Sequence, residues 1–115
     1  MIASDVLLGK NVIICEGAVL TVNIKIGNHV VININATVGH DAVLEDYASL
    51  MPGVHISGYD LLKEGCYLGT GSSVIQNVVV GCWSKIGAGA VVISDIADNS
   101  VAVGVPAKVI KKVER

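Results

Sequence analysis

The sequence predicts an all-β solenoid whose coils have three short, flat sides. Three observations predict it: an aliphatic residue recurs at every sixth position, small or β-branched residues mostly follow four positions later, and the 115-residue chain has no Phe and one Trp. Six residues turn a helix through about 600°, so this spacing cannot line one helical face. One inward aliphatic residue per side instead suits a coil of about eighteen residues.

The aliphatic positions run without a break along most of the chain. They are Leu8, Ile14, Leu20, Ile26, Ile32, Val38, Leu44, Leu50, Ile56, Leu62, Leu68, Val74, Val80, Ile86 and Val92. Stacked at the parallel-strand spacing of about 4.8 Å, these repeats predict about five coils and a prism roughly 24 Å long. A narrow prism has no room for aromatic rings in its interior, which explains the absence of Phe.

Two further positions of the repeat describe how each coil turns. Four residues after each aliphatic residue lie Val12, Ala18, Ile24, Val30, Ala36, Ala42, Ala48, Val54, Asp60, Cys66, Ser72, Val78, Ser84, Ala90 and Ile96. We expect these small side chains to fill the inward corners, and Asp60 is the member that breaks the pattern without an evident reason. Gly often directly follows the aliphatic residue, as at Gly39, where we expect the chain to bend with little steric room.

Composition limits the function classes. We expect one domain, with a β-helix over residues 1–97 and a closing segment with a basic tail over 98–115. The net charge of −2 gives no reason to expect nucleic acid, and the apolar stretches are too short and interrupted to span a membrane. Residues 1–6 do not read as a secretory signal. Three Cys without metal-binding spacing are typical of cytoplasmic thiols.

Valine recurs at the outward last position of several repeats. These residues are Val19, Val31, Val43, Val79 and Val91. An exposed apolar stripe of this kind favours an interface over bare surface. We therefore expect a cyclic homotrimer, with a monomer carrying scattered surface valines as the alternative.

Two stretches make the chain resemble a known family. The repeat itself, the segment NATVGHDAVLEDYASLMPGVHISG at 35–58 and the ending VAVGVPAKVI at 101–110 resemble the hexapeptide-repeat acyltransferases. Within them the sequence is most similar to the sialic acid O-acetyltransferases and the amino-sugar-nucleotide N-acetyltransferases. The resemblance implies left-handed coils, acetyl-CoA as acyl donor and a sugar acceptor. The family's usual N-terminal sugar-binding domain has no counterpart before Leu8, and its frequent second histidine is Ser49 here.

His40 is the candidate general base. It follows Gly39 at a position that points outward from the turn, and imidazole is suited to accept a proton near neutral pH. Asp41 beside it can orient the ring. Gly58 lies eighteen residues further on, so we expect it to stack on the His40 turn, where its N–H can hold a developing oxyanion. The resemblance implies the same three roles.

A second column of turn residues provides candidate contacts to the acyl donor. The resemblance implies that Thr70 and Ala88 contact it through their backbone, in a groove between neighbouring subunits. Lys108 then either reaches the nucleotide phosphates or belongs to a solvated basic tail. Asn33, seven residues before the base, matches an asparagine that lies near the acceptor in these enzymes.

Three other functions compete with acetyl transfer to an amine or hydroxyl of a sugar or nucleotide sugar. The γ-type carbonic anhydrases share the solenoid and bind zinc through three histidines, but His29, His40 and His55 occupy different repeat positions, so no metal site is expected. A non-catalytic β-helix scaffold or assembly protein is the principal alternative. A remnant domain that binds coenzyme A without turnover is the third.

Overall fold

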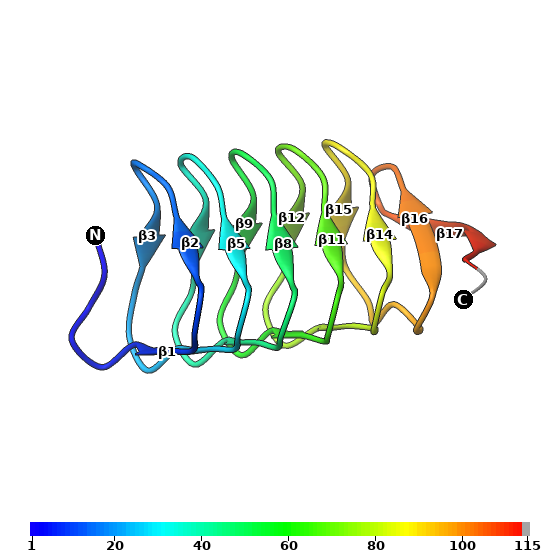
Figure 1. Cartoon of the computed structure of the whole chain (residues 1–115). Helices are drawn as coiled ribbons and strands as arrows, with labels where there is room; N and C mark the ends of the chain where they lie inside the picture. Colours follow the sequence, from blue (N-terminus) through cyan, green and yellow to red (C-terminus); the bar gives the residue numbers. More distant parts are fainter. Residues whose placement is uncertain (114–115) are drawn as a thin grey trace.

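The computed structural model describes residues 1–113 as a prism of stacked coils with three parallel sheets along its sides (Figure 1). The coils wind left-handed, which confirms the predicted fold class. Residues eighteen apart pair in register, for example Leu44 with Leu62 and Leu62 with Val80. Within residues 1–113 there is no helix of the length and apolarity needed to cross a membrane.

We name the three sheets A, B and C. Sheet A contains β3 (Val19–Leu20), β6 (Thr37–Val38), β9 (His55–Ile56), β12 (Ser73–Val74) and β15 (Val91–Val92). Sheet B contains β1 (Leu7–Leu8), β4 (Lys25–Ile26), β7 (Val43–Leu44), β10 (Leu61–Leu62) and β13 (Val79–Val80). Sheet C contains β2 (Ile13–Ile14), β5 (Val31–Ile32), β8 (Ser49–Leu50), β11 (Tyr67–Leu68), β14 (Lys85–Ile86), β16 (Ser100–Val103) and β17 (Lys108–Lys112).

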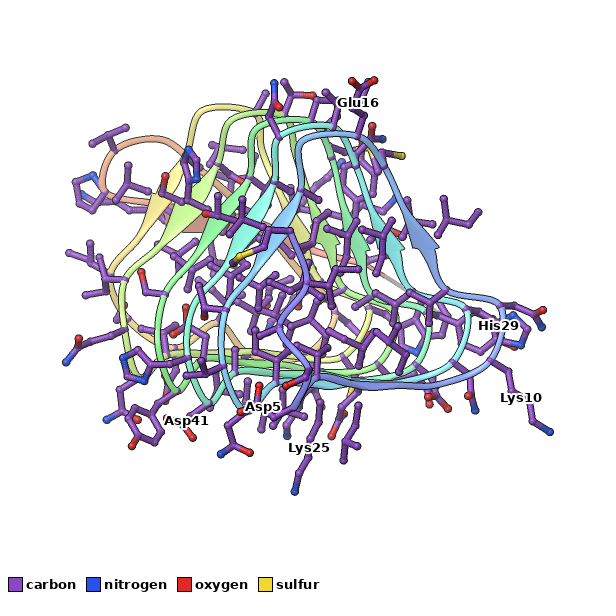
Figure 2. All side chains as sticks on the ribbon, turned by 90° about the vertical axis from the view of Figure 1, so that its left-hand side faces the viewer. Asp5, Lys10, Glu16, Lys25, His29 and Asp41 are labelled. Carbon is purple, nitrogen blue, oxygen red and sulfur yellow. The ribbon has the colours of Figure 1, made fainter. Side chains whose placement is uncertain are left out.

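Four-residue turns join the sheets along three edges of the prism. The A–B edge is formed by turns 21–24, 39–42, 57–60 and 75–78; the B–C edge by 9–12, 27–30, 45–48, 63–66 and 81–84; the C–A edge by 15–18, 33–36, 51–54, 69–72 and 87–90. Seen from the N-terminal end in Figure 2, Asp41, His29 and Glu16 mark these three edges in that order. Because the coils are in register, equivalent turns stack along each edge.

The interior consists of the two sets of residues that the sequence predicts: one aliphatic residue on each side of a coil and one corner residue after it. The second residue of each strand points inward and is buried from Leu20 to Val92, and the corner residues are buried from Ala18 to Ile96. Leu8 is different, because it is 48% exposed. It belongs to the first coil, which has no neighbouring coil on its N-terminal side.

The bend of each turn lies two residues later than the sequence analysis placed it. The third turn residue has a left-handed backbone, as at Asn23 (φ 53°), Asp41 (φ 61°), Tyr59 (φ 59°) and Asn77 (φ 61°) along the A–B edge. A type II turn requires this conformation. Asn and Asp adopt it readily, whereas Tyr does so at a cost of about 1 kcal/mol or more.

The glycines that follow the aliphatic residues serve close packing between coils. A Cβ atom at Gly39 would lie 2.7 Å from the backbone N of Gly58, and one at Gly69 would lie 2.7 Å from the backbone N of Ala88. Neither glycine has a positive φ. Gly is therefore required there because the next coil passes too near for a side chain.

The predicted valine stripe does not form. Val19 and Val91 lie on sheet A, Val43 and Val79 on sheet B, and Val31 on sheet C. All five are half-buried. The one-in-six spacing places outward residues on all three sides in turn, so residues at this repeat position share a face only when their separation is a multiple of eighteen.

The C-terminal segment continues sheet C and then reverses. Strand β16 pairs in parallel with β14, and β17 folds back antiparallel on β16 (Figure 1). Residues 104–107 lie on the last C–A turn, since the Ala107 N–H donates to the Val91 carbonyl at 2.8 Å. Of the expected closing segment over 98–115, residues 114–115 lie outside the described part of the chain.

Candidate active site

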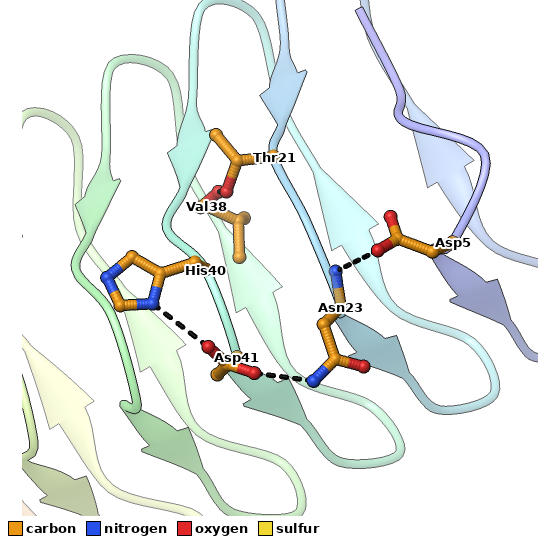
Figure 3. A network of polar contacts seen from close by, with 6 residues as sticks. All are labelled: Asp5, Thr21, Asn23, Val38, His40 and Asp41. Atoms are coloured by element: carbon orange, nitrogen blue, oxygen red, sulfur yellow. Dashed lines mark hydrogen bonds and ion pairs between the residues drawn. The ribbon is translucent and has the colours of Figure 1, made fainter.

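His40 and Asp41 are the two central residues of the A–B turn 39–42. The Nδ1 atom of His40 lies 3.0 Å from Oδ2 of Asp41 (Figure 3). The imidazole is 54% exposed and the carboxylate 26%. The left-handed backbone of Asp41 lets these two neighbouring side chains meet, because in an extended chain they would point to opposite sides.

A column of polar residues along the same edge holds the carboxylate in place. The other oxygen of Asp41, Oδ1, accepts a hydrogen bond from Nδ2 of Asn23, one coil earlier. The backbone N–H of Asn23 in turn donates to Oδ2 of Asp5 at 3.0 Å (Figure 3). Sequence reasoning missed Asn23, although the eighteen-residue spacing that identified Gly58 also relates Asn23 to Asp41.

The surroundings of Asp41 keep it ionised. The hydrogen bond from His40 lowers its pKa most, and the hydrogen bond from Asn23 lowers it further. An ionised carboxylate facing Nδ1 favours the imidazole tautomer that carries its proton there. The lone pair of neutral His40 is then on Nε2, the atom turned away from Asp41 (Figure 3).

Gly58 lies directly against the imidazole, one coil further on. A Cβ atom built on Gly58 would be 2.5 Å from Nε2 of His40. The Gly58 carbonyl accepts from the Asn77 N–H at 2.9 Å. Its own N–H has no acceptor among residues 1–113. Gly58 as a whole is buried, and the imidazole lies against it.

Tyr59 supports the other side of the histidine. Its ring meets that of His40 edge-on, with the ring centroids 5.3 Å apart, and its N–H donates to the His40 carbonyl at 2.9 Å. Such edge contacts are worth about 0.5–1.5 kcal/mol. Tyr59 is a second residue that sequence reasoning missed, and it stands eighteen positions after Asp41.

The remaining candidates lie on the C–A edge, across sheet A from His40. Thr70 and Ala88 are exposed and occupy stacked turns, and the Gly89 N–H donates to the Thr70 carbonyl at 2.8 Å. Lys108 begins β17 directly after residues 104–107, which pack on the same edge. These three residues therefore line one edge of the prism.

Asn33 also lies on the C–A edge rather than beside His40. Its Oδ1 accepts from the N–H of Ile34 at 2.8 Å and so supports its own turn. The structure thus brings His40, Asp41 and Gly58 together, and places Asn33 on the edge of Thr70 and Ala88. Within one chain the two groups are separated by the width of sheet A.

The other two histidines stand apart from His40. His29 stacks on Tyr47 on the B–C edge, with ring centroids 5.0 Å apart, and His55 points outward from sheet A with its Nδ1 2.8 Å from Oγ1 of Thr37. In the described residues, no three His, Cys, Asp or Glu side chains gather in a way that could hold a metal ion.

Two curated relatives each match a little under half of the chain. A putative acetyltransferase of Schizosaccharomyces pombe is 47% identical over 53 residues, which is 46% of this chain and 26% of that protein. The serine acetyltransferase of Bacillus subtilis is 43% identical over 58 residues, 47% of this chain and 27% of that enzyme. No established family profile matches the chain.

Solved structures match nearly all of it. PerB from Caulobacter crescentus, solved in complex with CoA and GDP-perosamine, has a TM-score of 0.92 at 34% identity; the match covers 96% of this chain and 53% of that one. The acetyltransferase domain of PglB from Neisseria gonorrhoeae, solved in complex with acetyl coenzyme A, has a TM-score of 0.72 at 33% identity and covers 95% and 56%.

The chain therefore spans about half the length of these solved relatives. The unbroken six-residue repeat and the left-handed three-sided prism agree with both sets of matches. On these grounds the chain resembles the hexapeptide-repeat acetyltransferases in its repeat and its fold along nearly its whole length.

Proposed function

We propose that the protein transfers an acetyl group from acetyl-CoA to an amine or hydroxyl of a sugar or nucleotide sugar. The observation that supports this best is the placement of His40, whose Nδ1 pairs with Asp41 while Nε2 lies against Gly58. A base and a residue whose backbone N–H has no acceptor within residues 1–113 thus lie in contact. A scaffold needs neither of them.

The reaction needs one proton acceptor and one oxyanion donor. Nε2 of His40 takes a proton from the acceptor amine or hydroxyl as that atom attacks the thioester carbonyl carbon. The ionised Asp41 stabilises the imidazolium that forms. When the tetrahedral intermediate collapses, the carbon–sulfur bond breaks and the CoA thiolate takes the proton from His40.

Gly58 is the proposed oxyanion donor. Its N–H has no acceptor within residues 1–113 and belongs to the residue against which Nε2 lies, and an oxyanion hydrogen bond of this kind contributes about 3–4 kcal/mol to many acyl transfers. Because the imidazole covers Gly58, we expect the thioester to enter between the ring and the glycine.

The separation of the two edges supports a homotrimer. Thr70, Ala88 and Lys108, the proposed contacts of acetyl-CoA, are on the C–A edge, and the base is on the A–B edge. A cyclic arrangement in which the A–B edge of one copy meets the C–A edge of the next would join both groups in each interface. Asn33 would then face the acceptor from the neighbouring chain.

Two acceptor classes follow from the relatives. PerB was solved with GDP-perosamine, which favours an amino sugar nucleotide, whereas the match to a serine acetyltransferase favours a small hydroxyl acceptor. We place the reaction in the cytoplasm, because acetyl-CoA and nucleotide sugars are both available there and the three cysteines are free.

Calorimetric titration with acetyl-CoA, followed by an acceptor screen, tests the proposal. We expect micromolar binding at about one site per chain, then release of free CoA with at least one amino sugar, nucleotide sugar or serine. Binding without turnover across the screen would favour a remnant domain. No binding at several temperatures would favour the scaffold, and His40 would then be an ordinary surface residue.

A further inference from the structure

One turn of the A–B edge departs from the backbone hydrogen bonding of its neighbours. In three turns of this edge the first turn residue donates its N–H to a carbonyl of the next coil: Thr21 to Val38 at 3.2 Å, Gly39 to Ile56 at 2.7 Å and Ile75 to Val92 at 3.1 Å. Ser57 does not follow this pattern. Its N–H donates to Oδ2 of Asp60 at 3.0 Å.

Asp60 is the residue that interrupts the predicted row of small corner side chains. It is 1% exposed, and both of its oxygens accept hydrogen bonds. Oδ2 accepts from Ser57 in its own turn, and Oδ1 accepts from the Val78 N–H of the next coil at 2.9 Å. The carboxylate therefore supplies a link to the following coil at the turn where the regular backbone hydrogen bond of the first turn residue, Ser57, is absent.

This exceptional turn is the one that carries Gly58. The Ser57 N–H, just before Gly58, is held by Asp60, and the Gly58 carbonyl, just after it, is held by Asn77. Between these two fixed points lies the Gly58 N–H, which has no acceptor within residues 1–113. Asp60 thus holds the backbone of the residue that immediately precedes the Gly58 N–H.

We propose that Asp60 is a positioning residue, whose buried carboxylate moves the Ser57–Gly58 peptide out of the regular coil geometry and aims the Gly58 N–H at the space beside Nε2 of His40. The inference rests on the proposed acetyl transfer at His40. A charged residue at this place is costly for the fold, because burial raises the pKa of Asp60 to about 6. Val occupies the same corner position at Val54 and Val78. Departures from a local rule of this kind concentrate at functional sites.

The variant Asp60→Val tests the proposal, since it supplies the side chain that the corner otherwise favours. We expect it to fold and to be at least as stable as the native chain at pH 7. In its crystal structure the Ser57 N–H should donate to the Val74 carbonyl, as its neighbours do. We expect kcat to fall at least about tenfold while KM for acetyl-CoA changes less than about twofold.

Cys66→Val is the matched control. Cys66 is buried at the equivalent corner position on the B–C edge, away from His40, so its replacement should change kcat less than about twofold. Asp60→Asn retains one acceptor and should give an intermediate kcat. It also serves as the test variant if Asp60→Val does not fold.

Three outcomes overturn the inference: unchanged kcat in Asp60→Val, an equal loss in Cys66→Val, or a Ser57–Gly58 peptide that does not move. A merely structural role predicts stability and kcat falling together, whereas a positioning role predicts lower kcat at equal or greater stability. If the native chain transfers no acetyl group at all, the proposed function fails. The position of the Gly58 peptide in the variant then still shows whether Asp60 controls it.

Discussion

The imidazole of His40 lies over Gly58, so close that a Cβ on the glycine would come within 2.5 Å of Nε2. The two residues are eighteen positions apart and belong to successive turns of one edge. A base and a hydrogen-bond donor are thereby brought together by stacking alone, without a loop or a helix to carry them. The predictions below follow from this contact and from the residues around it.

His40→Ala should reduce kcat by about a thousandfold, because the acceptor loses its general base. The affinity for acetyl-CoA and the oligomeric state should remain nearly unchanged, since the side chain is largely exposed and does not contribute to the core. Calorimetry, sedimentation and steady-state rates measure these quantities. His29→Ala, on the B–C edge, is the control and should keep kcat. Loss of folding in His40→Ala would instead show a structural role for the residue.

Asn23→Ala should raise the pKa of Asp41 toward its ordinary value, since one of the hydrogen bonds that stabilise its carboxylate is lost. The shift can be followed by NMR titration of the Asp41 carboxyl carbon. With His40 less well oriented, kcat should fall by about tenfold. An unchanged pKa of Asp41 would mean that Asn23 does not support the pair of Asp41 and His40.

Gly39→Ala should destabilise the protein by about 1–3 kcal/mol, because its Cβ would collide with the backbone N of Gly58 at 2.7 Å. The free energy of unfolding in urea measures the effect. Gly71→Asn is the control: a Cβ there meets nothing within 4 Å, and Asn tolerates the left-handed backbone of that position. Equal losses in both variants would contradict the packing explanation.

Asp60 should make the native chain less stable as the pH rises. Its pKa is raised from 3.8 to about 6, so between these values the folded state holds a proton that the unfolded chain releases. Its contribution is therefore greatest below about pH 4, falls through pH 4–6 by about 3 kcal/mol in total, and is level above that. The free energy of unfolding in urea, measured against pH for the native chain and for Asp60→Val at equal protein concentration, isolates the contribution of Asp60. If the stability of the two proteins changed with pH in the same way, this prediction would be contradicted.

Two variants that are each inactive alone should form active mixed trimers when they are coexpressed. His40→Ala removes the base from the A–B edge, and Ala88→Tyr blocks the C–A edge at an exposed residue. If each site combines the A–B edge of one chain with the C–A edge of the next, random mixing leaves about a quarter of the interfaces intact. Coexpression and rate measurement test this. Absence of recovery in mixed trimers would place each site within one chain.

The positions of several residues were predictable because a solenoid repeats by translation. Once a period of six defines a coil, residues eighteen apart must stack, and His40 with Gly58 follows from counting alone. The same rule would have found Asn23 and Tyr59. The repeat was misleading for the valines at its last position. They were predicted to form one exposed stripe, but they lie on three different sides of the prism.

The period of six was thus sufficient, by itself, to determine the prism, its core and the register of its turns, because each six-residue repeat buries one strand residue and one corner residue in so narrow a structure. Hydrogen bonding in three dimensions decided the rest. The left-handed backbone of Asp41 turned its carboxylate to His40, and the buried Asp60 took over the Ser57 N–H. The width of sheet A separated Asn33 from the base. The contacts of Asp41 and Asp60 depend on which donor finds which acceptor, and a hydrophobic period carries no information about that.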